Sequence, residues 1–165
     1  MKRLCLALAL VILGGCGDDD DDDDCPIAGD PELDVGIPDT VTFLNFAALP
    51  DDGDIPLSSN GQTFLAVQLA VRARNFSSAA HIGLDVTYTP AGGPARVASK
   101  DDSIEERLFC RADGFLYVVP VVVSSEDLGD DLEIADQPVD IELTITDDEG
   151  RTADATANGV LRRLY

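Results

Sequence analysis

Apolar and polar residues alternate along several stretches of the chain after residue 33. In 65–74, 82–88 and 139–146 every second residue is apolar, and those between are mostly small, polar or charged. A strand places successive side chains on opposite faces, so a period of two indicates strands with one buried and one exposed face. We therefore expect an all-β fold from about residue 33 onward.

Other strands are expected in less regular stretches. The segment 115–123 is apolar on both faces, which indicates a covered strand, and Pro120 within it indicates a bulge or an edge position. The segment 105–111 fits either a strand or, with Ser103 as a cap, a short helix. Further strands are expected over 41–46, 95–99 and 152–157, with Gly-containing turns at 91–94, 112–114 and 147–150.

Short strands separated by frequent turns indicate an antiparallel sandwich. The stretch 141–155, Ile-Glu-Leu-Thr-Ile-Thr-Asp-Asp-Glu-Gly-Arg-Thr-Ala-Asp-Ala, resembles the closing hairpin of bacterial immunoglobulin-like and PKD-type domains. The resemblance implies an antiparallel immunoglobulin-like sandwich of about 7–9 strands. Domains of this kind serve elsewhere as spacers, adhesins and partner-binding units.

The N-terminal residues have the order of parts found in an export signal. Basic residues at 2–3 precede an apolar run over 4–13. As a helix this run would span about 15 Å, half of a bilayer's hydrocarbon core, which favours a signal segment over a membrane-spanning helix. The next residues, Leu13-Gly14-Gly15-Cys16, resemble the lipobox of bacterial lipoproteins. The resemblance implies cleavage before Cys16 and acylation of Cys16, and two or more acyl chains anchor a protein durably.

Residues 18–24 are consecutive aspartates, which repel one another and offer no side chain for a core. We expect a disordered acidic spacer here, with calcium binding by the run as the alternative. The expected organisation is a signal peptide over 1–15, a lipidated cysteine and acidic tether over 16–32, and a β-sandwich domain over 33–165.

The cysteines fall into two groups under this reading. Cys5 would leave with the signal peptide and Cys16 would carry lipid, so Cys25 and Cys110 remain in the exported domain. A remaining pair in an oxidising compartment predicts a disulfide. A zinc site would need more ligands than these two cysteines and the single histidine, His81, can supply.

The charge balance excludes several classes of function. The 165 residues include 32 acidic and 11 basic ones, for a net charge of −21. Such a chain is not expected to bind nucleic acid or to be attracted electrostatically to anionic membranes. No nucleophile elbow, phosphate loop or dinucleotide fingerprint accompanies His81, so we expect no catalytic residue, no cofactor and no enzymatic activity.

Acidic clusters in the expected loops are the remaining candidates for a site. Oxygen ligands from several loops can converge on calcium, although none of these clusters matches the spacing of an EF-hand. We expect solvated loop charge and no defined metal site, with weak calcium binding as the alternative. The weak candidate ligands are Asp51, Asp52, Asp54, Asp147, Asp148 and Glu149.

Together these features predict a lipid-anchored cell-envelope protein that acts as a non-catalytic binding or structural module. Its membrane contact would be the N-terminal lipid, its partner a protein or polysaccharide, and the outer membrane its favoured location. The alternatives are a calcium-stabilised surface adhesion module and, third, an envelope enzyme.

Overall fold

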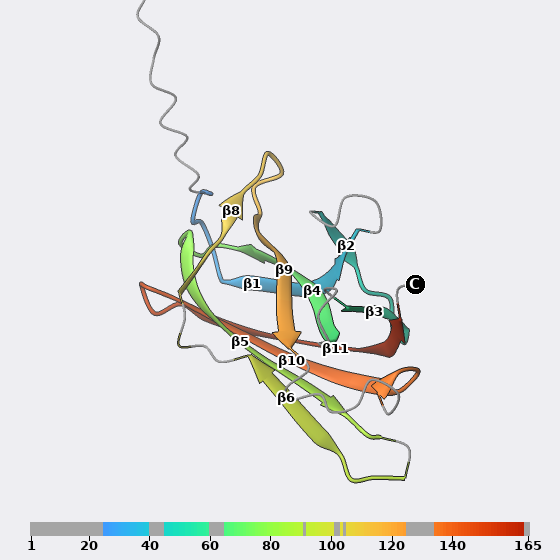
Figure 1. The fold of residues 1–165 in the computed structure, drawn as a ribbon. Helices are drawn as coiled ribbons and strands as arrows, with labels where there is room; N and C mark the ends of the chain where they lie inside the picture. The colour runs from blue at the N-terminus through green and yellow to red at the C-terminus, as the bar shows by residue number, and fades with distance from the viewer. Residues whose placement is uncertain are drawn as a thin grey trace, which may run out of the picture.

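The computed structural model describes residues 25–39, 45–59, 65–90, 92–100, 103, 105–124 and 134–163. These residues form strands and no helical element, which confirms the all-β expectation (Figure 1). The expected signal segment, Cys16 and the aspartate run lie outside the described residues. The strands are β1 (Glu32–Pro38), β2 (Phe46–Ala48), β3 (Gly53–Ser59), β4 (Leu65–Arg74), β5 (Ala79–Tyr88), β6 (Arg96–Lys100), β7 (Glu105–Arg107), β8 (Phe109–Cys110), β9 (Leu116–Ser124), β10 (Pro138–Asp147) and β11 (Thr152–Arg163).

All eleven strands belong to one hydrogen-bonded sheet that is not closed. One half of it, the β4 half, contains β1, β2, β4, β8 and β9. The other half, the β10 half, contains β5, β6, β7, β10 and β11. The sheet folds back on itself, since β1 contacts β11 and β6 contacts β9 without pairing (Figure 1).

Strand β3 joins the two halves. Its residues Gly53–Leu57 pair in parallel with Gly159–Arg163 of β11, while Leu57–Ser59 pair antiparallel with Leu65–Val67 of β4. The expectation of a purely antiparallel arrangement is therefore wrong at this join, and the sheet is mixed. The reason is a long-range pairing that brings together segments about a hundred residues apart, which local alternation cannot reveal.

The apolar residues of the alternating stretches form the core, as their period predicted. Val67, Leu69, Val71 and Ala73 of β4 are fully buried, and the inward residues of β5 and β10 join them in one cluster. The inward apolar residues of β5 and β10 are Ala80, Ile82, Leu84, Val86, Tyr88, Val139, Ile141, Leu143 and Ile145. Both halves of the sheet therefore share a single hydrophobic core.

Two less regular segments are strands. Residues 105–107 and 109–110 form β7 and β8, so the strand alternative holds and the short helix does not. In β9 the pairing with β4 shifts by one residue around Pro120, because Leu69 pairs with Val121 and Val71 with Val118. The extra residue is the bulge that the proline indicated.

The predicted disulfide is present. Cys25 and Cys110 are bonded, with their Cα atoms 5.3 Å apart, although the two residues are 85 positions apart in sequence. Cys25 is 4% exposed, and Asn75 binds the residues that follow it, accepting from the Ala28 N–H and donating to the Asp30 carbonyl. The first described residues are thereby held against the β8 end of the β4 half.

The parallel pair between β3 and β11 leaves no room for a side chain at Gly159. A Cβ placed there would lie 2.6 Å from the Gly53 carbonyl oxygen and 2.6 Å from the Ile55 Cδ1 atom. We expect Gly159→Ala to lower the free energy of unfolding by about 1–3 kcal/mol, the usual cost of overpacking. Gly93→Ala is the control, because its nearest neighbour is Pro90 Cβ at 3.6 Å. Equal urea midpoints for the two variants would contradict a tight join at β3.

Candidate functional site

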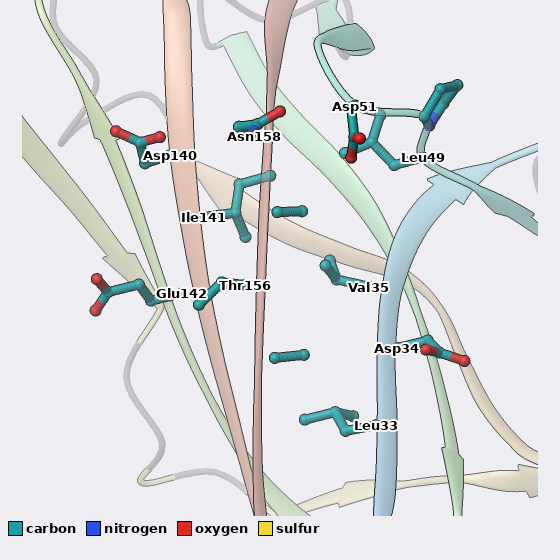
Figure 2. A pocket seen from close by; sticks show the side chains of 13 residues that line it. Leu33, Asp34, Val35, Leu49, Asp51, Asp140, Ile141, Glu142, Thr156 and Asn158 are labelled. Carbon is teal, nitrogen blue, oxygen red and sulfur yellow. The ribbon is translucent and has the colours of Figure 1, made fainter.

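A groove of about 620 Å³ lies between β1 and the β10–β11 hairpin. Figure 2 shows Leu33 and Val35 reaching from β1 toward β11. Leu49 lies at one end of the groove beside Asp51 and Asn158, where the chain turns into β3 (Figure 2). The groove therefore runs along the seam at which the two halves of the sheet face each other.

Small side chains on β11 create this space. Ala153, Ala155 and Ala157 alternate with polar residues and point to the interior, yet each is only half-buried. Opposite them Leu33 and Val35 are also half-buried, although they pack against the core. Larger inward residues on β11 would fill the gap, so the alanine pattern of the sequence is what leaves the groove open.

The polar residues around the groove are acidic or neutral. Its lining includes Asp34, Asp51, Asp140 and Glu142 and contains no lysine or arginine. Asp34 is paired with Arg72, which donates to its Oδ2 from Nε at 3.0 Å and from Nη2 at 2.6 Å. Asp51 lies at one end of the groove, whereas Asp140 and Glu142 lie on the exposed face of β10, opposite to buried Ile141 (Figure 2). The exposed face of the hairpin beside the groove is therefore negative.

The first group of predicted calcium candidates lies beside this groove but forms no cage. Asp51 lines the groove, Asp52 donates its backbone N–H to the Asn158 side chain, and Asp54 pairs with Arg162 Nε at 3.0 Å. The second group, residues 147–149, lies in the turn at the far end of β11, roughly 23 Å away at the rise of a strand. The structure does not bring the two groups together.

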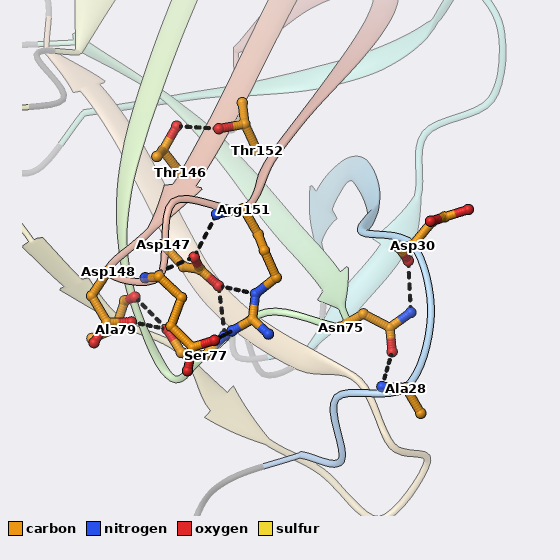
Figure 3. Close-up of polar contacts among 11 residues, drawn as sticks. Ala28, Asp30, Asn75, Ser77, Ala79, Thr146, Asp147, Asp148, Arg151 and Thr152 are labelled. Carbon is orange, nitrogen blue, oxygen red and sulfur yellow. Dashed lines mark hydrogen bonds and ion pairs between the residues drawn. The ribbon is translucent and has the colours of Figure 1, made fainter.

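In the second group, Asp147 is already occupied by protein donors. The residue is 3% exposed, and its carboxylate accepts from the Ser77 N–H at 3.0 Å and the Arg151 N–H at 2.8 Å (Figure 3). The Glu149 N–H adds a third backbone bond, and Arg151 Nε adds an ion pair at 2.7 Å. These contacts fix the β10–β11 turn against the start of β5, and calcium would have to displace them.

The same contacts determine how Asp147 titrates. Burial by itself raises the pKa of this carboxyl, but the hydrogen bonds from Ser77 and Arg151 and the charge of Arg151 outweigh it, so the pKa lies below its ordinary value. Asp148 accepts from the Ser77 hydroxyl and Glu149 pairs with Arg151 Nη2 at 3.2 Å. The acidic turn is therefore a structural network built on one arginine.

A ladder of arginine and aromatic side chains covers the outer face of the β4 half. The Arg72 guanidinium lies 4.8 Å from the centre of the Phe46 ring and 4.6 Å from that of Phe115. Arg74 stacks on Phe115 at 4.1 Å. Because guanidinium groups already occupy these ring positions, the ladder stabilises the sheet and is not an open platform for sugar stacking.

The ladder continues on β9. Arg111 lies 4.6 Å from the centre of the Tyr117 ring and donates to the Asn45 side chain at 2.7 Å. The Tyr117 hydroxyl donates to Asp113 at 2.6 Å, and this bond is the main cause of a lowered pKa at Asp113. Our reading of the sequence missed this ladder. Its only signal in the sequence is the spacing of two between Arg72 and Arg74, because their aromatic partners come from other parts of the chain.

The described residues contain no group of three or more His, Cys, Asp or Glu side chains arranged to hold a metal ion. His81 lies on β5, paired in register with Thr146 of β10 and Glu105 of β7. Within the described part of the chain, no helix is long and apolar enough to cross a bilayer.

No protein family model matches the chain, and no curated protein matches its sequence.

Removing the charge of Asp147 should destabilise the fold. We expect Asp147→Asn to lower the free energy of unfolding at pH 7 by about 2–3 kcal/mol, because it breaks a buried ion pair and weakens backbone bonds. The folded pKa is lowered, so this contribution is present above the ordinary aspartate range and is lost as pH falls through the folded pKa. The difference in the free energy of unfolding between wild type and variant, measured by urea denaturation, should therefore become smaller toward pH 3. Asp140→Asn, an exposed change, should shift stability by under about 0.5 kcal/mol at both pH values.

We expect calcium to change the stability of this protein only through ionic strength, and not through a specific site. With a net charge of −21, screening of self-repulsion should raise the melting temperature as ionic strength rises. Calcium, magnesium and sodium chlorides of matched ionic strength should give equal shifts. A specific site filled at 100 times its dissociation constant would add about 2.7 kcal/mol. Such a calcium-specific gain would contradict this prediction and favour the calcium-stabilised adhesion module.

Proposed function

We propose that the chain is a lipid-anchored protein of the bacterial cell envelope whose β domain is a non-catalytic binding or structural module. The observation that carries the proposal is the position of Cys25. It directly follows the aspartate run, is buried and is bonded to Cys110. A chain arriving from Cys16 therefore enters the domain at one fixed point, which suits a domain held at a surface.

The N-terminal sequence supplies the anchor in this proposal. The lipobox-like Leu13-Gly14-Gly15-Cys16 would place the lipid at Cys16. Nine residue steps separate Cys16 from Cys25, and a chain of that length reaches at most about 30 Å. The aspartate run then acts as a spacer, with the outer membrane as the favoured location. A disulfide in the domain agrees with an oxidising compartment.

The strand order supports the finer proposal of an immunoglobulin-like sandwich. In that fold the B, E and D strands lie in one sheet and the C, F and G strands in the other. Strands β4, β9 and β8 pair in the first order, and β5, β10 and β11 pair in the second. These strands also follow the same succession along the chain, from β4 as B to β11 as G. Strand β3 takes the place of A beside β4.

The groove supports binding as the role of the domain. Its half-buried apolar residues and the acidic face of the hairpin beside it offer a surface to a partner. The described clusters of titratable groups, by contrast, are engaged in ion pairs and turns. A protein or polysaccharide partner fits such a module. Display of the groove at a membrane surface is the function that these features support best.

Lipidation at Cys16 is the test of this proposal. Mass spectrometry of the membrane-extracted protein should find a mature N-terminus at Cys16 that carries acyl chains. Cys16→Ser should abolish the lipid and prevent processing, while Cys5→Ser, the control within the signal segment, should leave both intact. A mature chain that starts elsewhere and carries no lipid would refute the anchor.

A further inference from the structure

The positions of the hydrogen bonds between β10 and β11 show which backbone groups of β11 do not bond to β10. The Asp147 N–H donates to the Arg151 carbonyl, and the Leu161 N–H donates to the Gln137 carbonyl. In an antiparallel ladder, hydrogen-bonded pairs alternate with non-bonded ones, so odd-numbered residues of β11 bond to β10. The N–H and C=O groups of the even-numbered residues Thr152, Asp154, Thr156 and Asn158 therefore point away from β10.

Strand β3 takes up only part of that outward edge. It pairs with Gly159–Arg163, and among the described residues no strand pairs with the outer edge of Thr152–Asn158. We call this stretch the open edge. It is about 23 Å long at the rise of a strand, and its unpaired groups are a template for another strand.

We propose that the open edge binds an extended, basic segment of another polypeptide by strand addition. The inference rests on the proposed function and names the site and the class of its partner. The added strand would continue the line of β3, which already lies on the same side of β11 further along. Main-chain hydrogen bonds would give affinity and alternate side chains would give specificity.

The two faces of the added strand would meet different surroundings. Side chains that point into the groove would contact Ala155, Ala157 and Val35, which favours small or medium apolar residues. Side chains on the other face would lie beside exposed Asp154 and within reach of Glu142, because successive residues of a strand alternate between faces. Lysine or arginine suits that face.

Charge decides between another protein and a second copy of this chain. The lining of the groove contains no basic residue, and Glu142 lies directly opposite Asp85 in the β10–β5 register. Like charges facing each other in this way are destabilising, and a cation from a partner would relieve the repulsion. Two copies, each with a net charge of −21, would instead bring more negative charge to the edge.

The experiment uses the full chain extracted in detergent and capped synthetic octapeptides of alternating residues. A lysine–valine peptide is the probe, and a glutamate–valine peptide is the charge control. A lysine–valine peptide N-methylated at alternate residues keeps its charge but loses strand donors. Fluorescence anisotropy should show binding of the first peptide only. Amide hydrogen exchange should then slow at Thr152, Asp154 and Thr156.

Variants locate the site. Glu142→Lys combined with Asp154→Lys should weaken the lysine–valine peptide about five- to tenfold and admit the glutamate–valine peptide. Glu105→Lys, an exposed change on β7, is the matched control and should leave binding within about twofold. Thr156→Pro removes one outward N–H without removing a bond to β10, and it should also weaken binding. Circular dichroism checks that each variant is folded.

The possible results test strand addition independently of the proposed lipid anchor at Cys16. Equal binding of the N-methylated peptide, an unchanged affinity in the charge variant, or exchange protection away from 152–158 would overturn strand addition. Concentration-dependent self-association that protects the same amides would overturn it in favour of a second copy. None of these outcomes bears on lipidation at Cys16, and loss of the lipid would leave peptide binding in detergent unchanged.

Discussion

The division of β3 between two partners determines how the rest of the molecule is arranged. Leu57 lies at the crossing point, where it pairs with Arg163 of β11 on one side and Val67 of β4 on the other. At the other end of the parallel pair, Gly159 and Gly53 let the backbones approach closely, because a Cβ at Gly159 would collide with the Gly53 carbonyl. This join makes the two halves of the sheet face each other across one core. Since β3 pairs with β11 only from Gly159 onward, it also determines where the open edge begins.

The few basic residues of this acidic chain are concentrated in structural contacts. Arg151 holds Asp147, Arg72 holds Asp34, and Arg162 pairs with both Asp54 and Asp136. Each pair connects segments that must be held together: a hairpin turn, two neighbouring strands, or the end of β11 with the chain around it. Of the carboxylates along the groove, only Asp34 is paired with one of these arginines. The negative charge on the exposed face of the β10–β11 hairpin is therefore a consequence of where the arginines lie, and it favours a positively charged segment as the proposed partner.

Much of the fold followed from local pattern, and the candidate site did not. The inward residues of β4, β5 and β10, the bulge at Pro120 and the pairing of Cys25 with Cys110 were all predicted. The parallel pairing of β3, the donor from Ser77 to Asp147 and the arginine–aromatic ladder were not. Each of these depends on segments far apart in sequence, such as the 70 positions between Ser77 and Asp147.

The sequence by itself determined which side chains are buried, because alternation assigns every residue of a strand to one of two faces. It also predicted the pairing of Cys25 with Cys110, on the expectation that Cys5 leaves with a signal peptide and Cys16 carries lipid. Only the tertiary structure decided which strand edges are paired. Backbone groups are the same in every residue, so no residue type marks the outward edge of β11 over Thr152–Asn158. That edge exists because β3 begins only at Gly53, after a turn in which the Gly53 N–H donates to the Pro50 carbonyl, so its parallel pairing starts at Gly159 and leaves Thr152–Asn158 uncovered. Long-range packing alone specifies where that pairing starts.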